Sequence, residues 1–225
     1  MFNNDTLIII PAFNEGKTIL KIVNSLKNKY NYLVINDGSF DMSDKILSDN
    51  KVNYITNSEN IGLSKTMRIG MSYAIEKNFK YCIQFDGDGQ HDINTIDEMI
   101  SFRQNFNLIL ASRFLDKKKY TKYHWKKEMV WKFLRIIFKI KCGKTISDPT
   151  CGLRLFDKNF MLIYINDKNL TIEPSFICYA LKKQKMSIYE VGTNIKNRNH
   201  GESKFDKKSH QFYYLLREFS RMIFQ

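Results

Sequence analysis

The sequence has 225 residues, of which 43% are hydrophobic and 26% are charged, values typical of a soluble globular protein with one sizeable core. Its net charge of +13 is uneven: residues 1–115 hold 12 basic and 13 acidic side chains, whereas residues 116–225 hold 24 and 10. No apolar run approaches the roughly 18 residues of a membrane span, and no signal-peptide pattern is present, so an integral or secreted protein is not expected. The four cysteines lack C-x-x-C spacing, which favours reduced thiols in the cytosol.

The first 115 residues alternate between strand-like and helix-like patterns. Strands are expected at 6–10, 32–35, 52–56, 81–85 and 108–111, and helices at 18–29, 43–48, 63–77 and 93–104. This alternation predicts crossover connections and a mostly parallel sheet, in which ligands bind outside the carboxyl ends of the strands. Polar clusters follow four of these strands, at 11–15, 36–39, 86–91 and 112–113. Neither a dinucleotide nor a P-loop signature is present.

The second half is basic and amphipathic. Residues 116–127 combine lysines with aromatic side chains and are expected to form a mobile loop. Residues 128–140 predict a basic amphipathic helix, which is typical of a membrane surface; a core helix with a solvated basic stripe is the alternative. The remaining expected elements are a polar loop at 147–154, a helix at 173–183, a strand at 187–191, a polar loop at 197–204 and a helix from about 207.

Asp86 and Asp88 leave the buried strand at 81–85 and enter a loop that contains two glycines. Hard divalent cations prefer oxygen ligands, and Mg²⁺ usually takes one or two carboxylates together with phosphate oxygens. The Asp-x-Asp pattern therefore predicts a site for a divalent cation and a diphosphate. An acidic hairpin turn is the alternative, because Asp-Gly pairs are common in such turns.

Five polar segments follow one another along the chain: Ile10–Glu15, Asn36–Ser39, Asp86–His91, Asp148–Arg154 and Arg198–Lys204. In this order they resemble the family 2 glycosyltransferases of GT-A fold, and within that family the dolichyl- or polyprenyl-phosphate hexosyltransferases. The resemblance implies an α/β fold of GT-A type, with a mostly parallel nucleotide-binding sheet flanked by helices and a basic amphipathic C-terminal part. It implies one domain over 1–225, with a nucleotide-sugar-binding half at 1–115 and an acceptor-binding half at 116–225.

The resemblance also implies roles for individual residues. The nucleoside is expected at Pro11, Phe13, Glu15 and Asp37, and the metal and diphosphate at Asp86 and Asp88. Gln90 is expected to bind the donor close to the metal site, and Arg198 and Lys204 are expected on the donor phosphates. A Mg²⁺ or Mn²⁺ ion is expected at Asp86, Asp88 and Gln90. Together, the cation and the basic residues would stabilise the negative charge that develops on the departing nucleotide. Asp88 and Arg198 are therefore expected to be catalytic.

Three further residues have alternative interpretations. Asp148 is a candidate catalytic base for a hydroxyl acceptor; equally, it orients its loop or a metal-bound water, or forms a turn before Pro149. Arg113 binds the acceptor phosphate or pairs with a carboxylate. Arg154 binds the acceptor or the donor, or holds the Asp148 loop.

The resemblance implies an inverting, metal-dependent enzyme that moves a hexose from a nucleotide-diphosphate sugar to a polyprenyl phosphate. An anionic membrane surface is an expected partner, at the cytoplasmic face of the cell membrane. The alternative acceptor is a glycan hydroxyl in capsule, lipooligosaccharide or other surface-polysaccharide assembly. A nucleic-acid-binding protein is a minor alternative that leaves Asp86 and Asp88 unexplained, so no nucleic-acid partner is expected.

Overall fold

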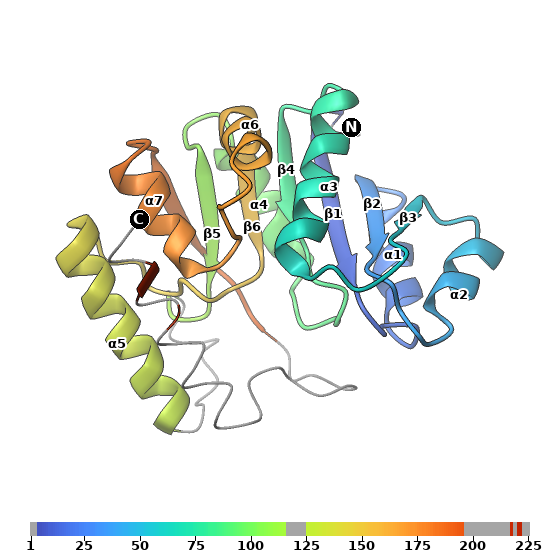
Figure 1. Cartoon of the computed structure of the whole chain (residues 1–225), viewed down its shortest axis with the longest axis horizontal. Coiled ribbons are helices and arrows are strands. Elements are labelled where there is room, and N and C mark those ends of the chain that lie inside the picture. The colour runs from blue at the N-terminus through green and yellow to red at the C-terminus, as the bar shows by residue number, and fades with distance from the viewer. Residues whose placement is uncertain (1–3, 116–124, 196–216, 218–219, 222–225) are drawn as a thin grey trace.

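The computed structural model describes residues 4–115, 125–195, 217 and 220–221, and Figure 1 shows a single sheet with helices on both faces. The strands are β1 (Thr6–Ala12), β2 (Asn31–Asn36), β3 (Tyr54–Thr56), β4 (Tyr81–Gln84), β5 (Leu108–Ser112), β6 (Arg154–Asp157) and β7 (Ile188–Gly192). The helices are α1 (Ile19–Leu26), α2 (Ser43–Asp49), α3 (Leu63–Glu76), α4 (Asn94–Phe102), α5 (Trp125–Cys142), α6 (Lys158–Asn166) and α7 (Pro174–Lys182). The predicted α/β fold with a mostly parallel sheet is confirmed.

The seven strands are ordered β3-β2-β1-β4-β6-β5-β7. β6 runs antiparallel to both of its neighbours, with Arg154 opposite Gln84 of β4 and Leu110 of β5. The other ladders, β1 with β2 and β4, β2 with β3, and β5 with β7, are parallel. Because β6 is reversed, its amino end lies where the parallel strands have their carboxyl ends. The 147–153 segment therefore reaches the same edge as the loops that follow β1, β2 and β4.

Three local predictions were wrong. Arg154 begins β6 and is not part of a loop, and α6 was not predicted. β6 has only four residues, and the loop-forming residues Asp148, Pro149 and Gly152 come shortly before it, so its sequence alone does not distinguish it from the loop. Residues 125–127 belong to α5 and extend that helix beyond the predicted start at 128.

Pro11, which was expected to end the first strand, lies inside β1. Its carbonyl faces the β4 side and accepts a hydrogen bond from Gly87 N at 3.2 Å. The β1–β4 ladder ends at Ile9 opposite Gln84, so the missing N–H of Pro11 removes no ladder bond. This position places Pro11 directly beside the loop that carries Asp86.

The core consists of two apolar layers, one on each face of the sheet. Successive residues of β1 alternate between them: Leu7 and Ile9 belong to the layer under α3, and Ile8 and Ile10 to the layer under α1. None of the four is more than 1% exposed, as expected for a strand covered on both faces.

Helix α5 has two different faces. Leu134 and Phe138 are buried (1% and 0% exposed) in the layer that also contains α7. The opposite face exposes Met129, Phe133, Ile136 and Ile140, together with Lys132 and Lys139. α5 therefore packs against the core, as the second alternative predicted. Its outer face differs from the predicted basic stripe, because it is an apolar stripe with lysines beside it. Among the described residues, no helix has the length and apolar character needed to cross a membrane.

Candidate active site

The loops that follow β1 and β2 are joined by reciprocal hydrogen bonds. Asn14 N donates to Ser39 Oγ at 2.9 Å, and Phe40 N donates to Asn14 Oδ1 at 2.9 Å. Asn14 adopts a φ of 57°, a left-handed conformation that asparagine tolerates better than most residues. The Phe13 and Phe40 rings meet edge to face with centroids 5.9 Å apart. Phe13, predicted to contact the nucleoside, thus lies in a loop whose backbone is fixed.

Asp37 holds the segment that leads into α3. Its Oδ1 accepts from Asn57 Nδ2 at 2.9 Å and Ile61 N at 3.0 Å, and its Oδ2 accepts from Gly62 N at 2.9 Å. The residue is only 5% exposed. Asp37 therefore has a structural role in this loop, and its predicted contact with a nucleoside stays a prediction.

Glu15 connects the β1 loop to the loop after β4. The residue is 8% exposed and lies just before α1. Its Oε2 lies 3.2 Å from the Thr18 hydroxyl, which donates to the Gly87 carbonyl at 2.8 Å. Glu15 is thus linked through Thr18 to the Asp86–Asp88 segment, and its role in donor binding stays a prediction.

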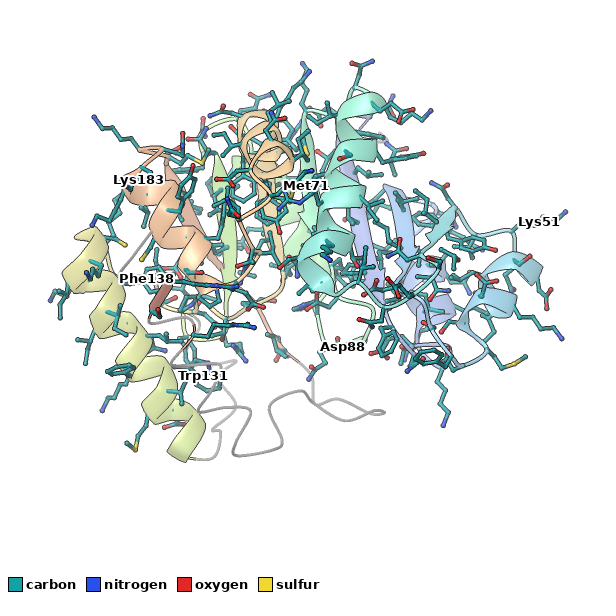
Figure 2. The ribbon with its side chains drawn as sticks, in the orientation of Figure 1. Lys51, Met71, Asp88, Trp131, Phe138 and Lys183 are labelled. Carbon is teal, nitrogen blue, oxygen red and sulfur yellow. The ribbon has the colours of Figure 1, made fainter. Side chains whose placement is uncertain are left out.

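Asp86 and Asp88 follow β4 near the middle of the sheet, and Figure 2 places Asp88 at the carboxyl edge, toward the same end of the molecule as Trp131 of α5. The segment leads from β4 into α4, so the hairpin-turn alternative is wrong. Asp86 Oδ1 accepts from Gln84 Nε2 at 2.9 Å, and its Oδ2 lies 3.2 Å from His91 Nε2. Asp88 Oδ1 accepts from the backbone N–H of Gln90 at 3.0 Å.

The electrostatic surroundings keep Asp86 ionised. Burial alone raises the pKa of Asp86, but hydrogen bonding to His91 and Gln84, together with the charge of Arg154, leaves that pKa below the ordinary carboxyl value. Two carboxylates beside a loop that contains two glycines fit a hard divalent cation that also takes phosphate oxygens. Within the described part of the chain, no three His, Cys, Asp or Glu side chains form a metal-binding group.

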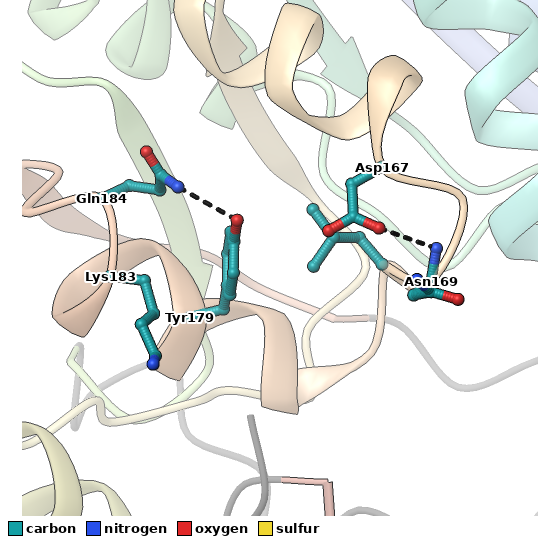
Figure 3. Close-up of a pocket in the computed structure, with 6 residues that line it drawn as sticks. Asp167, Asn169, Tyr179, Lys183 and Gln184 are labelled. Atoms are coloured by element: carbon teal, nitrogen blue, oxygen red, sulfur yellow. Dashed lines mark hydrogen bonds between the residues drawn. The ribbon is translucent and has the colours of Figure 1, made fainter.

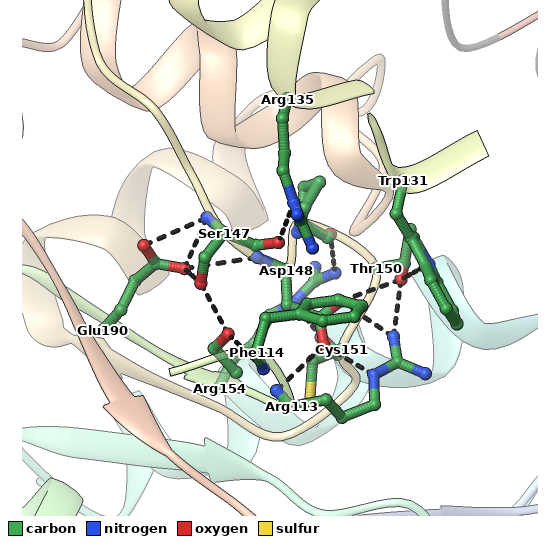
Figure 4. A network of polar contacts seen from close by, with 12 residues as sticks. Arg113, Phe114, Trp131, Arg135, Ser147, Asp148, Thr150, Cys151, Arg154 and Glu190 are labelled. Carbon is green, nitrogen blue, oxygen red and sulfur yellow. Dashed lines mark hydrogen bonds and ion pairs between the residues drawn. The ribbon is translucent and has the colours of Figure 1, made fainter. Parts of the chain in front are cut away.

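Asp148 lies on the other side of this edge, in a buried ion pair (Figure 4). Its Oδ2 accepts from Arg113 Nε at 2.6 Å, and its Oδ1 accepts from Arg113 Nη2 at 2.8 Å and Thr150 Oγ1 at 3.0 Å. The Asp148 side chain is 0% exposed. Burial alone raises the pKa of Asp148, but the adjacent Arg113 guanidinium and the hydrogen bonds hold it below the ordinary value. Of the roles considered for Arg113, the structure shows the pairing with a carboxylate.

Residues from β7 and α5 brace the same loop. Glu190 Oε1 accepts from Ser147 N at 2.9 Å and from Ser147 Oγ at 2.7 Å. From α5, Arg135 Nε donates to the Ser147 carbonyl at 2.7 Å, and Trp131 Nε1 donates to Thr150 Oγ1 at 3.0 Å. Figure 4 shows these side chains converging on the loop from separate elements. Sequence reasoning missed Glu190 and Trp131, and no local motif marks either of them.

Arg154 is oriented into the protein. It is 4% exposed and donates to the carbonyls of Cys151 at 2.7 Å, Pro149 at 3.0 Å and Ile172. These contacts correspond to the loop-holding alternative, and a contact of Arg154 with the acceptor or the donor stays a prediction. The contribution of Arg154 to the site is its charge near Asp86.

Other predicted site residues lie outside the described residues. These are Arg198 and Lys204, together with most of the basic 116–127 segment and of the helix expected from about 207. A pocket of about 470 Å³ beside α7 contains none of the predicted site residues (Figure 3). Its lining residues are Asp167, Asn169, Leu170, Tyr179, Lys183 and Gln184.

The sheet is mostly parallel, and a pair of carboxylates follows its central strand β4, which is the arrangement that the resemblance to GT-A glycosyltransferases implies. A solved structure of this class, glucosyl-3-phosphoglycerate synthase from Mycobacterium tuberculosis with Mn²⁺, uridine diphosphate and glucosyl-3-phosphoglycerate, matches with a TM-score of 0.65 and 12% identity. The match covers 99% of this chain and 81% of that one.

Sequence relatives give a narrower placement. The chain is 28% identical to a UDP-N-acetylglucosamine–dolichyl-phosphate N-acetylglucosaminyltransferase from Methanococcus voltae, over 82% of each protein. It is 23% identical to an undecaprenyl-phosphate mannosyltransferase from Micrococcus luteus, over 88% of this chain and 86% of that protein. The model of glycosyl transferase family 2 matches residues 7–162. The chain belongs to glycosyl transferase family 2 and is a glycosyltransferase with a GT-A fold.

Proposed function

We propose that this enzyme moves a hexose, with inversion, from a nucleotide-diphosphate sugar to a polyprenyl phosphate, with Mg²⁺ or Mn²⁺ bound at Asp86 and Asp88. The cation would neutralise the charge that develops on the departing nucleotide. Gln90 would complete the donor side beside Asp88, and Arg198 and Lys204 would contact the diphosphate, as the motif resemblance implies. Nucleotide-sugar use is supported by the Methanococcus voltae relative, whose name includes a UDP-sugar.

The observation that carries the choice of acceptor is the ion pair of Asp148. A hydroxyl acceptor needs a base that takes up its proton within hydrogen-bond reach. Asp148 is poorly suited to this role, because its side chain is 0% exposed, both oxygens accept hydrogen bonds and its pKa is lowered. A phosphate acceptor is already ionised at neutral pH and needs no such base. The named acceptors of the two relatives, dolichyl and undecaprenyl phosphate, belong to this chemical class.

The outer face of α5 supports a location at the membrane surface. Met129, Phe133, Ile136 and Ile140 are between 49% and 76% exposed. They recur at helical spacing, and α5 contains six basic residues and one acidic residue. A helix with this pattern inserts its apolar side chains at the lipid boundary, while its lysines contact anionic headgroups. We place the enzyme at the cytoplasmic face of the cell membrane as a peripheral protein.

Sugar transfer to defined acceptors tests the proposal. The protein is incubated with radiolabelled nucleotide sugars and Mn²⁺, together with either undecaprenyl phosphate or a surface-glycan acceptor. We expect label in the lipid fraction, and none after all divalent ions have been chelated. Transfer only to the glycan would replace the acceptor with the hydroxyl alternative. Transfer that continues in the presence of chelator would refute the role of the cation.

A further inference from the structure

Gly152, just before β6, lies directly against the carboxylate of Asp86. A Cβ atom at position 152 would be 2.1 Å from Asp86 Oδ2 and 2.9 Å from Asp86 Cγ. Real Cβ atoms essentially never approach so closely, so a side chain at position 152 would force the Asp86 carboxylate or the backbone to move. Any side chain added at position 152 would thus collide with Asp86, a predicted metal ligand.

The carboxylate of Asp86 is oriented by contacts on its other sides as well. Gln84 Nε2 donates to Oδ1 at 2.9 Å, and His91 Nε2 lies 3.2 Å from Oδ2. His91 is 8% exposed, and its ring meets Phe85 edge to face with centroids 5.5 Å apart. Asp86 therefore has one defined orientation, with Gly152 closing the side that faces β6.

The backbone around Gly152 cannot easily retreat from Asp86. The preceding carbonyl, of Cys151, accepts from Arg154 Nε at 2.7 Å, and the following carbonyl, of Leu153, accepts from Ala111 N at 3.0 Å. Cys151 and Leu153 are 2% and 0% exposed. If a side chain were added at position 152, the short carboxylate of Asp86 would therefore be the group that moves.

We propose that Gly152 is a positioning residue of the metal site: it fixes where the Asp86 carboxylate stands, and so ties the geometry of the donor side to the loop that Arg113 and Glu190 hold. The proposal rests on the proposed function, because it takes Asp86 to be a cation ligand. It adds that the cation site is built from both halves of the sequence, through contact between the segment before β6 and the carboxylate after β4.

The variant Gly152→Ala tests this inference. Its methyl group should displace the Asp86 carboxylate from the position in which it meets Gln84 and His91, and we expect the Kd for Mn²⁺ to rise by about 10- to 100-fold, as when groups that orient metal ligands are lost. Mn²⁺ binding is followed by electron paramagnetic resonance in the presence of a nucleoside diphosphate, which supplies the phosphate ligands, and without any sugar donor or acceptor, so the measurement does not depend on catalysis. An unchanged Kd for Mn²⁺ would overturn the inference.

Gly70→Ala is the matched control. A Cβ atom at position 70 would be 2.5 Å from Ile9 Cγ2, a collision of similar severity inside the core and away from the carboxylates. This variant should lower the melting temperature and leave the Kd for Mn²⁺ unchanged. If Gly70→Ala weakens Mn²⁺ binding as much as Gly152→Ala does, the effect is general damage to the fold and the inference fails.

Two further experiments test the inference if Gly152→Ala is unstable or if the wild-type protein does not bind Mn²⁺. If Gly152→Ala is unstable, adding Asp86→Ala removes the carboxylate and should restore the melting temperature; without that recovery, the collision lies elsewhere and the inference is wrong. If the wild-type protein binds no Mn²⁺, the proposed function fails. The crystal structure of Gly152→Ala then decides the positioning claim: a displaced Asp86 carboxylate supports it, and an unmoved one overturns it.

Discussion

The proposal divides the carboxyl edge of the sheet into a donor side, at Asp86 and Asp88, and an acceptor side, at the 147–153 segment. Carboxylates have different surroundings on these two sides. On the donor side, Asp86 and Asp88 follow β4, and their oxygens meet Gln84, Gln90 and His91, all within five positions along the chain. On the acceptor side, Asp148 is fully buried against Arg113, 35 residues away in sequence. A half-buried carboxylate with local partners retains the capacity to bind a cation. The contrast fits the proposal that Asp86 and Asp88 bind ligand on one side of the edge, whereas Asp148 holds a loop on the other.

The largest expected effect comes from removing the donor-side carboxylates. Asp86→Ala combined with Asp88→Ala should lower kcat/KM for sugar transfer by a factor on the order of 10³ or more, since a bound cation contributes several kcal/mol to a charged transition state. The melting temperature should change little compared with this loss, because neither residue belongs to the core. Transfer rates and thermal unfolding are measured side by side.

The control for this variant is Asp49→Asn, at an exposed position in α2. It removes one acidic side chain far from the edge and should leave both rate and melting temperature unchanged. Undiminished transfer by the double alanine variant would contradict the assignment of the cation site.

Breaking the acceptor-side pair should affect stability first. Arg113→Met leaves the Asp148 carboxylate buried without its counter-charge, and the loss of one partner of a buried pair costs about 3–5 kcal/mol. For a chain of this size each kcal/mol lowers the melting temperature by roughly 2–4 °C, so a decrease of about 10 °C is expected in calorimetry. The double variant Arg113→Met with Asp148→Leu should recover part of this loss, because no unpaired charge remains. If the single variant is as stable as the wild type, Asp148 does not depend on Arg113.

The same pair predicts a pH dependence. The folded-state pKa of Asp148 is lowered, because the effects of Arg113 and the hydrogen bonds exceed that of burial. Its contribution to stability is therefore present above the unfolded-state pKa of about 4, and is lost as the pH falls through the lower folded-state value. The difference in unfolding free energy between wild type and Asp148→Asn should accordingly narrow below about pH 4, measured by urea unfolding. A difference that widens as the pH falls would contradict the direction of the shift.

The donor side could be predicted from the sequence better than the acceptor side, because its contacts are local. The strand-loop patterns at Pro11–Glu15, Asn36–Ser39 and Asp86–His91 are local, so they could be recognised one by one and placed at one edge by the logic of a parallel sheet. β6 could not, because its four residues become a strand only through pairing with β4 and β5 on both sides. The role of Asp148 depends on that pairing, which brings its loop to Arg113.

Residues that act over long sequence distances were missed for the same reason. Glu190 lies 43 positions beyond Ser147 and accepts hydrogen bonds from the N–H and the hydroxyl of that residue. Nothing in the sequence around β7 distinguishes Glu190 from an acidic residue at the protein surface. Gly152 was predicted only as part of a loop motif. The collision that requires a glycine there depends on the three-dimensional position of Asp86.

The exposed face of α5 gives a smaller effect, on membrane binding. Phe133→Ser combined with Ile140→Ser removes two exposed apolar groups (49% and 76% exposed). Partial insertion of two such side chains is worth on the order of 2 kcal/mol, so binding to vesicles that contain anionic lipid should weaken at least about tenfold in flotation assays. Leu162→Ser is the matched control, on α6 away from α5 (Figure 1), and should bind as wild type does. Equal binding by all three proteins would exclude this face of α5 as the membrane contact.

The smallest effect concerns the link between that helix and the acceptor-side loop. Trp131→Phe keeps an aromatic ring 4.6 Å from the Arg113 guanidinium but removes the Nε1–H that donates to Thr150 Oγ1. Loss of one such hydrogen bond costs about 1 kcal/mol, so the melting temperature should fall by only roughly 2–4 °C. Because Thr150 also accepts from Arg113 and donates to Asp148, the variant should raise the KM for polyprenyl phosphate more than the KM for the nucleotide sugar. A change confined to the donor KM would mean that α5 and its loop act on the donor side, and that the division between the two sides of the edge is wrong.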